Sequence, residues 1–237
     1  MNFTATVKSW FLPWRAYVAE FLGTFVFVFL TCAAVLANEL TVDIGTVGIA
    51  LTAGFSYAAA VFATVSISGG NLNPAVSVGL WLAGKIASSV LVFYVAAQIL
   101  ASILAAWLLY LIFGDSGLKF FLGAPALGND VTLTTALIVE AVASAILIFV
   151  YFATLVDKRG PVSFGPLVLG LVITAATIFA FSISGAAFNP ARAVGPALIL
   201  RSYDFLVIYA VGPLIGSLFA IIYDFLFLKS FRKTPPG

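Results

Sequence analysis

The 237-residue sequence contains no histidine, a single cysteine and few charged residues. Without histidine, the chain cannot use an imidazole as a catalytic base or as a metal ligand. Because Cys32 is the only cysteine, neither an intramolecular disulfide nor a cysteine-based metal site can form. We therefore expect no metal and no cofactor, and nothing in the sequence indicates an enzyme.

Charged residues make up 8% of the chain and hydrophobic residues 63%, with a mean hydropathy of +1.18. A soluble protein carries charge on about a quarter of its residues. The composition therefore excludes cytosolic enzymes, secreted disulfide-rich proteins and disordered chains. Nucleic acid is excluded as a partner, because the eleven basic residues form no basic stripe. The sequence predicts an integral membrane protein in contact with the lipid bilayer.

Apolar stretches long enough to cross a bilayer occur six times. A helix needs about 20 apolar residues to span the hydrocarbon core. The predicted spans are residues 15–37, 44–66, 86–113, 132–155, 163–183 and 204–228. Two shorter stretches, 73–83 and 189–200, reach only half-way, because a helix rises about 1.5 Å per residue. We expect an all-α membrane fold of six transmembrane helices and two re-entrant half-helices, in one channel domain over residues 1–237.

Basic residues are unevenly distributed over the two sides of this arrangement. One side carries eight of the eleven: Lys8, Arg15, Lys85, Lys158, Arg159, Lys229, Arg232 and Lys233. The other side carries two basic and five acidic residues: Lys119, Arg201, Glu39, Asp43, Asp115, Asp130 and Asp204. Because basic residues are enriched in cytoplasmic loops, we expect both termini in the cytoplasm. Among cellular membranes, we expect the cell membrane.

The chain also contains an internal repeat. Residues 54–80 align without gaps on residues 170–196, with twelve of 27 positions identical at a constant offset of 116. Shared composition cannot place both Ser-Ile-Ser-Gly and Asn-Pro-Ala in each copy, so this is a duplication. We expect repeats at about 12–113 and 132–228, linked by an external loop at 114–131. Each repeat holds three spans, so the second is inverted, and inverted repeats place the solute pathway at their interface.

Each half-helix begins with the same tripeptide. The motifs are Asn73, Pro74 and Ala75 in the first repeat and Asn189, Pro190 and Ala191 in the second. A single motif would only mark a helix start, since asparagine caps helices and proline suits the first turn. In inverted repeats, however, the two N-termini face each other at mid-membrane. Each carries roughly half a positive charge, so together they oppose cations, including protons.

Further polar groups accompany the motifs. Non-helical backbone at membrane depth persists only where it is buried or lines a cavity. The loop residues expected to line the pathway with their backbone are Gly70, Asn71, Leu72, Ala187 and Phe188. Arg192 follows the second motif, and an arginine at this depth marks a pathway by default. We expect Glu20 and Glu140, at corresponding places in the repeats, to be structural acceptors for loop N–H groups, with a proton relay as the alternative.

These features resemble the aquaporin (major intrinsic protein) family. The resemblance rests on the paired Asn-Pro-Ala motifs, on Ala19 to Thr24 (AEFLGT) and on Arg192, and it covers about residues 12–228. The stretch from Ser68 to Trp81 resembles bacterial and plant vacuolar water channels most. The resemblance implies that each chain forms its own pore and that four chains form a homotetramer.

The resemblance also places a selectivity filter on four residues. They are Ala53, Thr177, Ala186 and Arg192. Strict water channels usually carry Phe at the first position and His at the second, so a wider filter is predicted, unless Phe55 or Tyr57 refills the space. The family's mercury-sensitive cysteine falls at Ala186, which predicts poor inhibition by mercury.

Other positions also distinguish solute classes within the family. Glycerol facilitators usually carry Asp at Ala193 and Lys at Ala197, whereas water channels typically carry Trp within the pair Tyr209-Ala210. Ala193 and Ala197 are therefore unlike glycerol facilitators, whereas Tyr209-Ala210 is unlike water channels. We expect a passive channel for water and small neutral solutes such as glycerol, urea or ammonia, closed to ions and protons. The alternatives are a glycerol-type facilitator with little water preference, a secondary transporter, which inverted repeats also build, and a junction protein with a vestigial pore.

Overall fold

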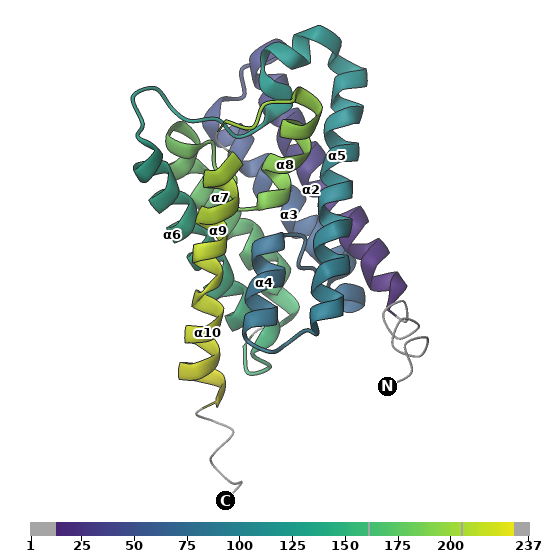
Figure 1. Ribbon diagram of the computed structural model, residues 1–237, viewed down its shortest axis with the longest axis vertical. Helices are drawn as coiled ribbons and strands as arrows, with labels where there is room; N and C mark the ends of the chain where they lie inside the picture. The colour runs from purple at the N-terminus through teal and green to yellow at the C-terminus, as the bar shows by residue number, and fades with distance from the viewer. Residues whose placement is uncertain (1–12, 161, 205, 230–237) are drawn as a thin grey trace, which may run out of the picture.

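The computed structural model describes residues 13–160, 162–204 and 206–229 (Figure 1). Within these ranges every regular element is helical. The α-helices are α2 (Trp14–Leu40), α3 (Gly45–Ser68), α4 (Pro74–Leu82), α5 (Ser88–Lys119), α6 (Leu133–Tyr151), α7 (Gly165–Ser184), α8 (Pro190–Leu200), α9 (Leu206–Ser217) and α10 (Phe219–Tyr223). The short elements are the 3₁₀ turns η1 (Phe121–Gly123) and η3 (Val162–Phe164) and the π-helical turns η2 (Phe152–Val156) and η4 (Asp224–Lys229).

Six segments are long and apolar enough to cross a membrane, which confirms the six-span prediction. They are Trp14–Leu40, Gly45–Ser68, Ser88–Lys119, Leu133–Val156, Val162–Ser184 and Leu206–Lys229. The half-helices α4 and α8 have only 9 and 11 residues. As Figure 1 is drawn, α4 occupies the lower half of the molecule and α8 the upper half.

The third span is longer than predicted. The sequence analysis ends it at residue 113, but α5 continues to Lys119, so residues 114–119 are helical instead of belonging to the loop. Gly114 has φ 54° and ψ −139°, which breaks the helix for one residue before it resumes. Glycine reaches this conformation without the clash that a Cβ would cause. The external connection therefore begins with a kinked helical extension.

Large apolar side chains cover the outside of the bundle. Leu22, Phe55 and Val207 are 54, 60 and 68% exposed. Water-soluble proteins rarely expose contiguous apolar surface on this scale. Lipid chains provide the matching environment, and the helices satisfy their backbone hydrogen bonds internally, as the bilayer requires.

α3 and α7 cross with their backbones in direct contact at Gly54 and Gly170. A Cβ added to Gly54 would overlap the Thr174 hydroxyl and the Gly170 carbonyl, and one added to Gly170 would overlap the Gly54 carbonyl. The two glycines are related by the repeat offset of 116. Small residues allow such close approach between membrane helices. The crossing thus joins the two repeats.

A cluster of charges ties three segments together at one end of the bundle. The ion pairs are Lys85–Asp224 at 2.6 Å, Lys229–Asp224 at 3.3 Å and Arg159–Asp157 at 2.5 Å. Arg159 also donates to the Phe227 carbonyl at 3.0 Å. Three basic residues from the side predicted to be cytoplasmic therefore meet here, and the connection after η2 is attached to η4.

The Asp157–Arg159 pair predicts a pH-dependent stability. Hydrogen bonds from the Arg159 side chain lower the pKa of Asp157 to about 2. The ionised carboxylate therefore stabilises the fold above its unfolded pKa of about 3.9, and this contribution is lost as the pH falls through about 2. We expect Asp157→Asn to lower the melting temperature at pH 5, and the difference from wild type to shrink between pH 4 and pH 2. A constant difference across that window would contradict this assignment.

Candidate functional site

The two half-helices begin with the same capping geometry. The Asn73 Oδ1 atom accepts a hydrogen bond from the Ala75 N–H at 2.8 Å, and the Asn189 Oδ1 atom accepts one from the Ala191 N–H at 3.0 Å. Both asparagines have extended backbone, with φ −156° and −149°, and proline follows each. Each Oδ1 satisfies an N–H group that the first helical turn leaves unpaired. This aims the amide nitrogen of each asparagine away from its own helix.

The amide nitrogens bond across to the opposite repeat. Asn73 Nδ2 donates to the Phe188 carbonyl at 2.8 Å, and Asn189 Nδ2 donates to the Leu72 carbonyl at 2.8 Å. The structure therefore brings the two motifs, 116 residues apart, to a common point. A side-chain amide carries two N–H bonds, so each asparagine retains one that these crossed bonds do not use.

Glu20 and Glu140 hold the two loops that lead into the half-helices. Glu20 accepts hydrogen bonds from the N–H groups of Asn71 and Leu72 at 3.0 and 2.7 Å. Glu140 accepts from the N–H groups of Ala187 and Phe188 at 2.9 and 2.6 Å. Serine hydroxyls donate to both carboxylates at 2.6 Å, Ser68 to Glu20 and Ser184 to Glu140, and Gln98 Nε2 also donates to Glu20 at 2.7 Å. Both carboxylates are fully buried, and this bonding is what a structural role requires.

The residue before each capping asparagine has a left-handed backbone. Leu72 has φ 53° and Phe188 has φ 51°. Such conformations cost non-glycine residues about 1–3 kcal/mol and persist only where the surroundings impose them. The carboxylate bonds to the N–H groups of these two residues supply that restraint, and the strain turns each carbonyl toward the opposite asparagine.

Several loop carbonyls already accept a hydrogen bond from the protein. Tyr151 donates to the Gly69 carbonyl at 2.7 Å, and Tyr57 donates to the Asn71 carbonyl at 3.1 Å. A carbonyl oxygen has two acceptor positions, so a second partner can still bind. The sequence singled out Tyr57 only as a residue that could refill the filter and did not single out Tyr151, because nothing in the spacing of either relates it to the loop.

Arg192 is bonded to its own loop. Its Nη1 atom donates to the carbonyls of Gly185 and Ala186 at 2.9 and 2.7 Å. Its Nε atom is buried without a hydrogen-bond partner in the described part of the protein. Ala53, Thr177, Ala186 and Arg192 are only 2, 2, 4 and 1% exposed. Ala186 and Arg192 are in contact, while Ala53 and Thr177 lie on the two helices that cross at Gly54 and Gly170.

Comparisons with known proteins agree with this geometry. The family described as Major intrinsic protein matches residues 6–223. The chain belongs to this family. It is 39% identical over 230 residues to the probable aquaporin TIP4-1 of Oryza sativa subsp. japonica, an alignment that covers 93% of this chain and 90% of the rice protein. It is 36% identical over 219 residues to aquaporin-4 of Homo sapiens, covering 90% of this chain and 68% of the human protein.

The fold agrees with a solved member of the family. The X-ray structure of the aquaglyceroporin from Plasmodium falciparum superposes with a TM-score of 0.82 at 24% sequence identity, covering 94% of this chain and all of that one. This confirms the aquaporin fold of six spans and two half-helices. As an aquaporin, the chain is a passive membrane channel for water and small solutes, and not an enzyme.

The structure distinguishes Phe55 and Tyr57, the two aromatic residues considered for the predicted filter of this aquaporin. Phe55 is 60% exposed on the outer face of α3, so it does not refill the space beside Ala53. Tyr57 is fully buried and is bonded to the Asn71 carbonyl. Of the two, only Tyr57 lies on the buried face that carries Ala53, one helical turn further along α3.

The connection between α5 and α6 packs onto the loop between α7 and α8, whose carbonyls accept hydrogen bonds from Arg192. The sequence did not predict this contact. Gly185 contacts the backbone of Pro125 and Ala126 so closely that a Cβ would overlap them. Gly128 donates its N–H to the Ile183 carbonyl at 3.0 Å. Together these contacts place residues 125–128 against the end of α7 and the loop that follows it. Gly128 and Gly185 both lie at close backbone contacts, but their positions in the sequence do not indicate which segment they contact.

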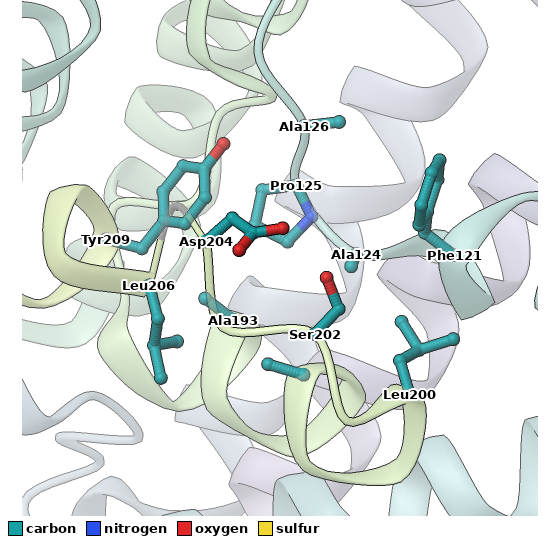
Figure 2. Close-up of a pocket in the computed structure, with 11 residues that line it drawn as sticks. Phe121, Ala124, Pro125, Ala126, Ala193, Leu200, Ser202, Asp204, Leu206 and Tyr209 are labelled. Atoms are coloured by element: carbon teal, nitrogen blue, oxygen red, sulfur yellow. The ribbon is translucent and has the colours of Figure 1, made fainter. Parts of the chain in front are cut away.

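A cavity of about 250 Å³ lies beside α8 (Figure 2). Figure 2 shows Tyr209, Asp204 and Ser202 around it, together with apolar side chains from the external connection. Ala193 and Ala197 both line it. Larger side chains at these two positions, as in glycerol facilitators of the family, would fill this space. The cavity is thus the structural counterpart of two alanines that the sequence analysis singled out.

Mercury compounds are expected to leave water flux through this aquaporin unchanged. Cys32 is fully buried, and Gly123 lies directly against its backbone, so the thiol is shielded from the aqueous phase. The measurement is osmotic water permeability with and without mercuric chloride. Ala186→Cys places a thiol at the filter and is the matched control, expected to become sensitive. Inhibition of the wild type that Cys32→Ser removes would contradict this prediction.

Proposed function

We propose that this channel conducts water together with small neutral solutes, namely ammonia, urea and glycerol. The proposal depends on one observation above all: Ala53 and Thr177 have small side chains, and Phe55, which is 60% exposed on the opposite face of α3, adds no bulk beside them. Small side chains at the filter leave a wider pore, which solutes larger than water can enter. Pore diameter and the placement of hydrogen-bond donors set selectivity in such channels.

The proposed pathway passes Arg192 and then the two asparagines. A solute oxygen would accept a hydrogen bond from Arg192, whose Nε has no partner among the described residues, and then from the unused N–H of Asn73 or Asn189. Acceptors would be the second lone pairs of the loop carbonyls, including those of Gly70, Asn71, Leu72, Ala187 and Phe188. Cations and protons would be opposed by Arg192 and by the positive ends of α4 and α8.

We further propose a homotetramer in the cell membrane with both termini in the cytoplasm. Support for the orientation comes from the charge cluster at Lys85, Arg159 and Lys229, at the end of the bundle where α2 begins and η4 ends (Figure 1). Basic residues favour the cytoplasmic side. Support for the tetramer comes from the family alone. Protease access to tagged termini in sealed cells tests the orientation.

Stopped-flow light scattering on proteoliposomes tests the proposed solutes. Vesicles are exposed to osmotic gradients of sucrose, urea and glycerol in parallel with protein-free vesicles. We expect fast shrinkage in sucrose, and shrinkage followed by rapid re-swelling in urea and glycerol. Fast shrinkage without re-swelling would restrict the channel to water and overturn the wider solute range. Shrinkage no faster than in protein-free vesicles would overturn conduction through this site.

A further inference from the structure

Ala53 and Tyr57 lie one helical turn apart on the buried face of α3, with exposed fractions of 2% and 0%. From Ala53, α3 continues through Tyr57 toward Ser68 and the loop that carries Asn73. Four residues of helix advance about 6 Å, so Tyr57 lies deeper along the helix than the filter position. A small side chain at the filter is therefore followed, one turn deeper, by a large one.

Two contacts fix the Tyr57 ring. Its hydroxyl donates to the Asn71 carbonyl at 3.1 Å. Its ring meets the ring of Phe27 edge-on, with centroids 5.0 Å apart and an interplanar angle of 80°. Phe27 is itself 2% exposed. Asn71 cannot easily move, because its N–H is bonded to Glu20 at 3.0 Å. The phenol is thus held between α2 and the loop two residues before Asn73.

The second repeat has smaller side chains at the corresponding positions. The offset of 116 relates Tyr57 to Ile173, and the offset of 120 between Glu20 and Glu140 relates Phe27 to Leu147. Ile173 and Leu147 are 3% and 1% exposed, and all four side chains belong to one buried cluster. The first repeat therefore supplies two aromatic rings where the second supplies two aliphatic chains.

We propose that Tyr57, supported by Phe27, forms a second constriction beside the loop that leads to Asn73 and sets the upper size limit for solutes. This inference rests on the proposed function, since it concerns solutes that have already passed Ala53 and Thr177. The Tyr57 hydroxyl donates its hydrogen bond to the Asn71 carbonyl, so a passing solute would meet the apolar edge of the ring. A longer polyol loses hydrogen bonds to water at an apolar narrowing, and Tyr57 would select by size and by polarity.

The test is Tyr57→Ile, which gives the first repeat the residue that the second repeat already has. In proteoliposomes we expect the ratio of glycerol to water permeability to rise about tenfold, equivalent to about 1.4 kcal/mol of barrier. We also expect entry of erythritol, which the wild type excludes. Tyr57→Phe keeps the ring and is the matched control, expected to retain the wild-type ratio. Retained water flux shows that each variant is folded.

A double variant moves the ring instead of removing it. Tyr57→Ile with Ile173→Tyr is expected to exclude erythritol again, because the bulk returns at the repeat-related position. A Tyr57→Ile channel that conducts water with the wild-type glycerol ratio would overturn the constriction. If that variant conducts no water, Phe27→Leu removes the ring that supports Tyr57 and gives the first repeat the counterpart of Leu147, and an unchanged glycerol ratio there would also overturn the constriction.

Failure of the proposed function has a different signature. A wild-type channel that conducts water but neither urea nor glycerol would overturn the proposed solute range. Tyr57→Ile would still decide the constriction in that case, since glycerol entry in the variant alone supports it. Wild-type vesicles that shrink no faster than protein-free vesicles would overturn conduction itself.

Discussion

Glycerol and urea fluxes are expected to fall by about 100-fold in the double variant Ala53→Phe with Thr177→His, while water flux stays within about threefold of wild type. Both positions are buried, at 2% exposure each, and they lie on the two helices that cross at Gly54 and Gly170. Two bulky rings added there would leave room for water only. Stopped-flow scattering in sucrose, glycerol and urea measures the three permeabilities.

The matched control for this variant changes the same positions without adding bulk. Ala53→Ser with Thr177→Ser should keep the wild-type fluxes of all three permeants. If the Phe and His variant still conducts glycerol at the wild-type rate while it conducts water, then these two residues do not line the narrowest part of the channel.

Gly54→Val is expected to prevent folding of the channel or to destabilise it by about 3 kcal/mol or more. The added side chain would collide with backbone, at the Gly170 carbonyl, and with the Thr174 hydroxyl. The Gly170 carbonyl belongs to the backbone and cannot rotate away, so relief requires α3 and α7 to separate. The measurement is the monodisperse fraction after detergent extraction, together with the thermal midpoint of any soluble protein.

Ala59→Val provides a control on the same helix. Ala59 is exposed, so the added methyl groups meet no packed neighbour and this variant should resemble wild type. Gly170→Val should be as damaging as Gly54→Val, because the crossing is reciprocal. Wild-type yield and thermal midpoint for Gly54→Val would show that the two helices pack less closely than the glycines indicate.

The sequence predicted those parts of the structure that depend on local pattern or on repetition. Span length follows from the thickness of the bilayer, and six spans were found. Pairing of the two half-helices followed from the duplication, because a motif that occurs once in each inverted copy is brought together by symmetry. The positions of Glu20 and Glu140 followed from the same correspondence between the repeats.

Contacts without a repeat counterpart were not predictable. Tyr57 corresponds to Ile173, so symmetry gives no indication that a tyrosine hydroxyl bonds the Asn71 carbonyl. The contact of Pro125 and Ala126 with Gly185 depends on how an irregular segment folds back over the bundle. Such a path is determined by tertiary packing, and periodicity carries no information about it. The helical extension at residues 114–119 was missed because Gly114 reads as a helix terminator.

The crossed bonds between the asparagines also have a consequence for biogenesis. When only the first repeat has entered the membrane, the Leu72 carbonyl lacks its donor from Asn189, and the Asn73 amide lacks its acceptor on Phe188. Unpaired polar groups raise the free energy of a chain in a hydrocarbon environment. At that stage α4 therefore lacks the hydrogen bonds that stabilise its position. The crossed hydrogen bonds at the centre of the channel can form only after the ribosome has synthesised residue 189. The first repeat can therefore complete its fold only when the second half has been translated.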